Sequence, residues 1–198
     1  MIIDVIIDSF MSQTFQRSSM KAVFSPLPIN DSHPMTSKFL NHIEDLIDHP
    51  VVSDLHNYSQ HLNTSRFQHS LNVAYYAFLF GRRFNINLSD CVRGAFLHDL
   101  FLYNWRTEQI TPGKHVNVHP QEALKNAKMI TLVSPVMEDV IVNHMWPLGN
   151  SKPKSKEAWI VQASDKLCAV MEVTQQLKSK SLHHNLAGVM LGLILFLR

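Results

Sequence analysis

The sequence contains few charged residues, few glycines and only two cysteines. Charged residues make up 17% of the 198 residues and hydrophobic residues 45%. Because an average globular protein is about 25% charged, this composition argues against intrinsic disorder. Cys91 and Cys168 have no partner at motif spacing, which argues against a disulfide framework and against a cysteine zinc site. We expect both to be buried thiols.

Runs of basic residues are also missing. Lysine and arginine total 18 against 16 aspartates and glutamates, which gives a formal charge of +2. No basic run is available to follow a phosphate backbone, so we do not expect the chain to bind a nucleic-acid polymer. Histidine is the abundant polar residue instead, with 12 copies against 6 glycines. It is the commonest metal ligand in proteins and the side chain that titrates near neutral pH.

The hydrophobic runs are too short to cross a membrane. The N-terminal stretch MIIDVIIDSF is interrupted by Asp4 and Asp8, and no lysine or arginine precedes it as in a secretory signal. The run Leu186–Leu197 has 12 residues, whereas a spanning helix needs about 20. We expect this run to be a terminal helix docked on the core, with an interfacial membrane anchor as the alternative. The sequence therefore predicts a cytoplasmic protein without a transmembrane segment.

Low glycine content, prolines near expected helix ends and the absence of alternating Val/Ile/Thr runs predict an all-α fold without a sheet. The length fits one domain. We expect an irregular or flexible lead-in over residues 1–35, a helical domain over 36–180 and an apolar C-terminal helix or tail over 181–198. The expected helices are Thr36–Ile47, Thr64–Phe84, Leu88–Leu102, one starting at His119-Pro120, Pro135–Met145 and Lys156–Lys178.

Histidines and aspartates recur where apolar residues would be expected to face the core. His69 shares a helix face with Val73 and Tyr76 at spacings of about one and two turns, so its imidazole should point inward. His98 and Asp99 are flanked by apolar residues on both sides in GAFLHDLFLYNW. A bare carboxylate is expensive to bury there, so its burial becomes reasonable if Asp99 binds a cation.

The same pattern returns further along the chain. His144 follows Val140 and Ile141 by one turn, and Asp165 interrupts the apolar face of EAWIVQASDKLCAVME. Five expected helices each offer an inward histidine or aspartate: His69, His98 with Asp99, His119, His144 and Asp165. Four imidazoles and two carboxylates are enough to hold two divalent metal ions bridged by a carboxylate, with positions open for water and substrate.

At these positions the chain resembles the HD-domain superfamily, in which His, His-Asp and Asp follow one another along a helical bundle. The residues that carry the likeness are His69 in SRFQHSLNVA, His98-Asp99 in GAFLHDL and Asp165 in ASDK, within residues 60–175. The resemblance implies a single compact HD-type bundle and a metal-dependent phosphohydrolase.

His119 in VHPQEAL and His144 in VNHMWPL look like the histidines of the subset that binds a second metal, which includes HD-GYP-type cyclic-dinucleotide phosphodiesterases. In that subset a pair of adjacent histidines is common where this chain has His144-Met145, and the GYP signature is missing. This departure weakens the case for a second metal and for cyclic-dinucleotide cleavage. A di-iron oxygenase branch of the superfamily also uses four histidines and two aspartates in this order.

Cationic residues near these ligands are candidates for substrate contacts. Arg66 precedes His69 by about one turn, so it either binds a substrate phosphate or forms a structural ion pair. Lys166 follows Asp165 directly; the resemblance gives it a substrate-facing or ligand-supporting role, and helix geometry alone also allows it to reach solvent. Together with Asp99, these two residues are our catalytic candidates.

The remaining histidines have no carboxylate context. Lys114 and His115 lie in a Pro-Gly loop, where a substrate lid or an ordinary loop is expected. We interpret the others as surface or lid residues: His56, His61, His183 and His184.

The sequence thus favours a hydrolase of a small-molecule phosphate ester, with a nucleotide as the expected substrate. The expected cofactor is one or two divalent ions of manganese, iron, cobalt, nickel or zinc. The alternatives are an HD-type di-iron oxygenase and a non-catalytic module that senses a nucleotide or a metal.

Overall fold

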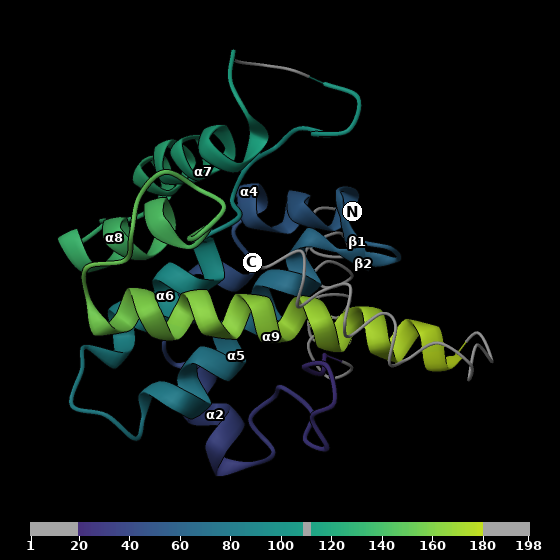
Figure 1. The fold of residues 1–198 in the computed structure, drawn as a ribbon. Coiled ribbons are helices and arrows are strands. Elements are labelled where there is room, and N and C mark those ends of the chain that lie inside the picture. Colours follow the sequence, from purple (N-terminus) through teal and green to yellow (C-terminus); the bar gives the residue numbers. More distant parts are fainter. Residues whose placement is uncertain (1–19, 109–111, 180–198) are drawn as a thin grey trace, which may run out of the picture.

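The fold is a bundle of helices with one small hairpin, as seen in a computed structural model that describes residues 20–108 and 112–179 (Figure 1). The all-helical class predicted from the sequence is confirmed, except that two short strands pair antiparallel where no sheet was expected. The elements are α2 (Pro34–Leu40), α3 (Glu44–Ile47), α4 (Pro50–Ser53), the 3-10 helix η1 (Asp54–Asn57), β1 (Ser59–His61), β2 (Thr64–Ser65), α5 (Arg66–Gly81), α6 (Leu88–Leu97), α7 (His115–Ile130), α8 (Pro135–Asn143) and α9 (Lys156–Ser179).

Local capping sets where several helices begin. Ser65 accepts a hydrogen bond from the backbone N–H of Gln68 at the start of α5, and Ser134 does the same for Met137 at the start of α8. Pro135 occupies the first turn of α8, where a missing N–H costs nothing. Helix α5 begins at Arg66 and not at the expected residue 64, because Thr64 and Ser65 pair with β1.

Helix ends differ from the expected ones around the histidines. Helix α6 stops at Leu97 with His98 as its C-cap, short of the expected end at Leu102, and α8 likewise ends with His144 as its C-cap. Helix α7 begins at His115, earlier than expected, so Pro120 lies inside the helix and not at its first position. As a result, His98 and His144 stand at helix ends, where the chain turns away and leaves room for other ligands.

Helix α5 is central and packs against both α6 and α9, while α8 packs on α6 and α9. Figure 1 shows α9 crossing in front of α5 and α6, with α7 and α8 grouped at one end of the bundle. The close approach of α6 and α8 depends on Gly94, because a Cβ atom there would lie 2.9 Å from Cγ1 of Val140. Helix α8 is therefore the helix that approaches α6 at Gly94.

Residues 20–33 are irregular but pack on the bundle through Ala22, Val23 and Ile29, all of which are buried. Cys91 and Cys168 are buried free thiols, as predicted. Between residues 20 and 108 and between 112 and 179, no helix combines the length and the hydropathy needed to cross a bilayer. The apolar run Leu186–Leu197 lies outside the described residues.

Candidate metal centre

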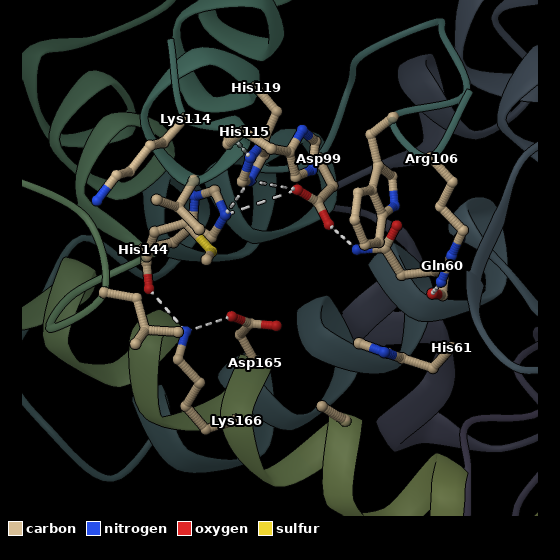
Figure 2. A pocket seen from close by; sticks show the side chains of 15 residues that line it. Gln60, His61, Asp99, Arg106, Lys114, His115, His119, His144, Asp165 and Lys166 are labelled. Atoms are coloured by element: carbon tan, nitrogen blue, oxygen red, sulfur yellow. Dashed lines mark hydrogen bonds and ion pairs between the residues drawn. The ribbon is translucent and has the colours of Figure 1, made fainter. Parts of the chain in front are cut away.

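The six side chains singled out in the sequence meet at one place in the bundle. They come from α5, the end of α6, α7, the end of α8 and α9, and none is more than 7% exposed: His69, His98, Asp99, His119, His144 and Asp165. Figure 2 shows four of them, Asp99, His119, His144 and Asp165, around a cavity. Among the described residues, four groups of three histidine or acidic side chains have ligand atoms close enough to hold a metal ion, and every group includes some of these six.

Three of the four imidazoles are oriented by backbone carbonyl groups. Because a carbonyl oxygen only accepts, the Nδ1 atom of each ring carries the proton and Nε2 carries a lone pair. The contacts join His98 Nδ1 to Ala95 O at 2.7 Å, His119 Nδ1 to His115 O at 2.8 Å and His144 Nδ1 to Ile141 O at 2.8 Å. Each ring therefore presents a metal-binding nitrogen toward Asp99, which is the arrangement expected of metal-ligating histidines.

His69 is oriented by a carboxylate instead. Its Nδ1 atom lies 3.1 Å from both carboxylate oxygens of Glu172, and its Nε2 atom lies 3.0 Å from Oδ1 of Asp165. Burial favours the neutral ring, but the negative charges of Glu172 and Asp165 outweigh it and raise the pKa of His69 well above its usual value. Glu172 is itself held by Asn72, whose Nδ2 donates to it at 2.7 Å.

Glu172 was missed in the sequence analysis. It is 2% exposed and lies seven residues after Asp165, two turns further along the same face of α9. That spacing was the available signal, because a second acidic residue interrupts the same apolar stretch.

The centre contains buried polar atoms without a partner. Oδ1 of Asp99 and Nε2 of His98 are buried and accept no hydrogen bond from the described residues. The Nε2 atoms of His119 and His144 face each other at 3.0 Å, and two lone pairs repel at that distance unless a cation lies between them. Metal–nitrogen bonds of 2.0–2.1 Å place neighbouring ligand atoms about 3 Å apart. The donor set therefore fits a divalent cation.

Charge favours the same conclusion. Burial and the neighbouring His98 hold the pKa of His144 well below its usual value, so this ring is neutral and free to bind a metal. Burial opposes ionisation of Asp165, but the ammonium group of Lys166, 2.7 Å from Oδ2, outweighs it and holds the pKa of Asp165 well below its usual range. The neutral ring of His144 and the ionised carboxylate of Asp165 are the protonation states that metal binding requires.

Arg66 does not line the cavity. Its side chain is fully buried, stacks 3.4 Å from the ring centroid of Phe101, and donates to the carbonyl oxygens of Phe101 and Tyr103. Burial lowers the pKa of Arg66 to about 10, so the group stays charged at neutral pH. Of the two roles considered from the sequence, this position supports the structural one. The partners are carbonyl groups and not the acidic residue of an ion pair.

Gln60 links Arg66 to the metal centre. Its Oε1 atom accepts from Nε of Arg66 at 3.2 Å, and its Nε2 atom donates to Oδ2 of Asp99 at 2.6 Å. Arg66 thus reaches Asp99 through Gln60, a residue that the sequence analysis did not single out. The hairpin that carries Gln60 was missed as well, since its two strands contain only five residues.

A cavity of about 600 Å³ opens beside these groups. Lys166 lies on its wall, where Nζ donates to Asp165 and to the carbonyl oxygen of His144 (Figure 2). The described residues that line the cavity are Gln60, His61, Asp99, Trp105, Arg106, Lys114, His115, Val116, His119, His144, Met145, Leu148, Asp165, Lys166 and Ala169. Lys114 and His115 therefore do lie at the site.

The other histidines named in the sequence analysis differ in whether they line the cavity. His61 lines the cavity and contacts His69 edge-on at a ring distance of 5.0 Å. His56 stacks on Phe67 at 4.0 Å and is not among the residues that line the cavity. His183 and His184 lie outside the described residues.

Comparison with known proteins agrees with this geometry. The sequence model of the HD domain matches residues 66–170, more than half of the 198-residue chain and a span that contains all six side chains of the centre. No curated protein and no solved structure gives a significant match.

Proposed function

Because the chain belongs to the HD-domain family, we propose that it is a metal-dependent phosphohydrolase that acts on a phosphate ester of a small molecule. The observation that supports this most is the convergence of four imidazoles and two carboxylates beside a cavity of about 600 Å³. Cavities of this size bind small molecules.

Two ions are proposed, with Asp99 shared between them. Nitrogen and oxygen donors without a thiolate suit manganese, iron, cobalt, nickel or zinc. When bound, such ions would supply Lewis-acid charge and an activated water for in-line attack on phosphorus. We assign His69, His98, Asp99 and Asp165 to one ion, and Asp99, His119 and His144 to the other.

The protein's own groups prepare the site before substrate arrives. Carbonyl groups hold the rings of His98, His119 and His144 in the ligating tautomer, so little reorganisation is needed during the reaction. Lys166 makes two hydrogen bonds inside the protein. Because an ammonium group has three donors, one N–H of Lys166 remains for a substrate phosphate. Asp99 contributes as the shared ligand and Arg66 as a positioning residue behind Gln60.

Hydrolysis is favoured over oxygenation by the charge of the cavity wall. Three cationic side chains, Arg106, Lys114 and Lys166, line the cavity, and such a wall attracts a phosphate dianion. A C–H bond to be oxidised has no need of these charges. A nucleotide is the first substrate to be tested. The full set of ligands favours an enzyme over a non-catalytic sensor.

The test is phosphate release from a panel of phosphomonoesters and phosphodiesters, with manganese supplied under strict anaerobiosis. We expect turnover at the same rate with and without oxygen, because hydrolysis consumes only water. Activity that appears solely with iron and oxygen would show that the chain is an oxygenase. Reversible nucleotide binding without turnover of any ester would identify a sensor.

A further inference from the structure

Part of the cavity wall is apolar. Val116 comes from α7, Met145 and Leu148 follow α8, and Ala169 comes from α9, with Trp105 completing the wall. Leu148 is 37% and Trp105 38% exposed, so both side chains are accessible from the cavity. A substrate group placed here meets hydrocarbon on several sides.

The polar side chains of the same cavity are largely engaged within the protein. Both ends of the Gln60 amide are used, one by Asp99 and the other by Arg66. Arg106 donates to the carbonyl oxygen of Gln60 at 3.1 Å and lies over the ring of Trp105 at 4.4 Å. These groups are therefore poorly available to a substrate hydroxyl.

Few free polar groups remain. The ammonium of Lys114 and the ring nitrogens of His61 have no hydrogen bond or ion pair with the described part of the chain. His115 is stacked between Trp105 at 4.8 Å and His119 at 4.4 Å, and Nδ1 of His115 lies 3.4 Å from the hydroxyl of Tyr103. A ring with four or five hydroxyls would leave most of them unpaired, and each unpaired group costs roughly tenfold or more in affinity.

We propose that the organic part of the substrate is an apolar aliphatic or aromatic group with few hydroxyls, seated against Val116, Met145 and Leu148. The inference rests on the proposed function for the phosphate, which occupies the end of the cavity near Asp99. Phosphates of sugars and of inositol are disfavoured by the same wall. A nucleotide fits the wall only through the faces of its base.

Alkylphosphonates test this proposal by binding alone, because their P–C bond resists hydrolysis. Binding of methyl-, propyl-, pentyl- and heptylphosphonate to the full chain with manganese is measured by calorimetry. Affinity should rise about fourfold for each added methylene until the wall is covered. In competition assays, cyclohexyl phosphate should displace a bound phosphonate at lower concentration than myo-inositol 1-phosphate, which has the same ring with five hydroxyls.

A substitution in the apolar wall tests whether that wall causes the rise in phosphonate affinity. Leu148→Asn should reduce the ratio of heptyl- to methylphosphonate affinity severalfold. The matched control Leu132→Asn, at a side chain 95% exposed between α7 and α8, should leave that ratio unchanged. Equal affinities along the series, tighter binding of the inositol phosphate, or no binding of any phosphonate would overturn the proposal. A rising series with no hydrolysis of any ester would instead refute the proposed reaction and leave the apolar class standing.

Discussion

The four histidines of the centre form two pairs. His119 and His144 line the cavity, and we call them the cavity half. His69 and His98 are not among the residues that line it, and we call them the inner half. Asp99 lies between the two halves. Its Oδ1 is 3.3 Å from His119 Nε2 and its Oδ2 is 3.5 Å from His98 Nε2. The inner half is removed from substrate, while the cavity half faces it.

The two halves also differ in what orients one of their rings. Glu172, an anion, orients His69, whereas neutral carbonyl groups orient His98 of the inner half and both rings of the cavity half. A carboxylate behind an imidazole raises the ring's basicity and thereby its strength as a ligand. We therefore expect one ion to be held firmly as part of the fold and the other to exchange more readily beside the cavity.

The largest effect is expected at Asp99, which lies between the two halves. Asp99→Asn replaces the shared anion by a neutral amide, so both ions should be lost and phosphate release should fall on the order of a thousandfold or more. Elemental analysis and initial rates measure the two effects. Retention of both ions with near-normal activity would show that Asp99 is not the shared ligand.

Substitutions that remove one ring from each half distinguish the two halves. His69→Ala and His119→Ala should each deplete one ion, but only His69→Ala removes the cationic partner of the buried carboxylate of Glu172 and leaves it the hydrogen bond from Asn72. Removing one partner of a buried ion pair costs about 3–5 kcal/mol. Thermal unfolding should therefore show a much larger loss for His69→Ala than for His119→Ala. If both variants lose equal stability, the proposed difference between the halves is wrong.

A smaller change weakens the inner half without removing a ligand. Glu172→Gln should lower the affinity of the inner ion about 10- to 100-fold and leave the cavity ion unchanged, as measured by competition with a chelator. Glu157→Gln is the matched control on the same helix, because its carboxylate accepts from the backbone N–H of Asn87 and not from a histidine. Equal affinity losses in the two variants would assign Glu172 a purely structural role.

The smallest effect is expected at Lys166. Lys166 donates to Asp165 and to the carbonyl oxygen of His144, so Lys166→Met should keep the metal content and lower kcat/KM about tenfold, or about 1.4 kcal/mol. Lys156→Met, an exposed lysine at the start of α9, serves as control. Loss of metal from Lys166→Met alone would contradict a role directed at the substrate.

The inward position of His69, His144 and Asp165 was predictable because helical periodicity turns them toward the core, and that of His98 and Asp99 because apolar residues flank them on both sides. A carboxylate such as Asp99 or Asp165 on an apolar face already signals a cation, since its burial is costly without one. The family resemblance then supplied the expected order of ligands.

What the sequence did not reveal depends on contacts between distant segments. Glu172 meets His69 across 103 positions of the chain, and periodicity does not report which of several acidic residues occupies that place. Gln60 lies on a hairpin too short to produce an alternating pattern. Arg66 lies on the predicted face, but its contacts with the carbonyl oxygens of Phe101 and Tyr103 follow from where the chain turns after α6.

Anomalous diffraction from crystals of the full chain loaded with manganese would locate the proposed ions directly. We expect two ions about 3.5–4 Å apart, one bound by the inner half and one by His119 and His144, with Asp99 bound to both. A single ion at the inner half, with the rings of His119 and His144 ligating nothing, would contradict this expectation.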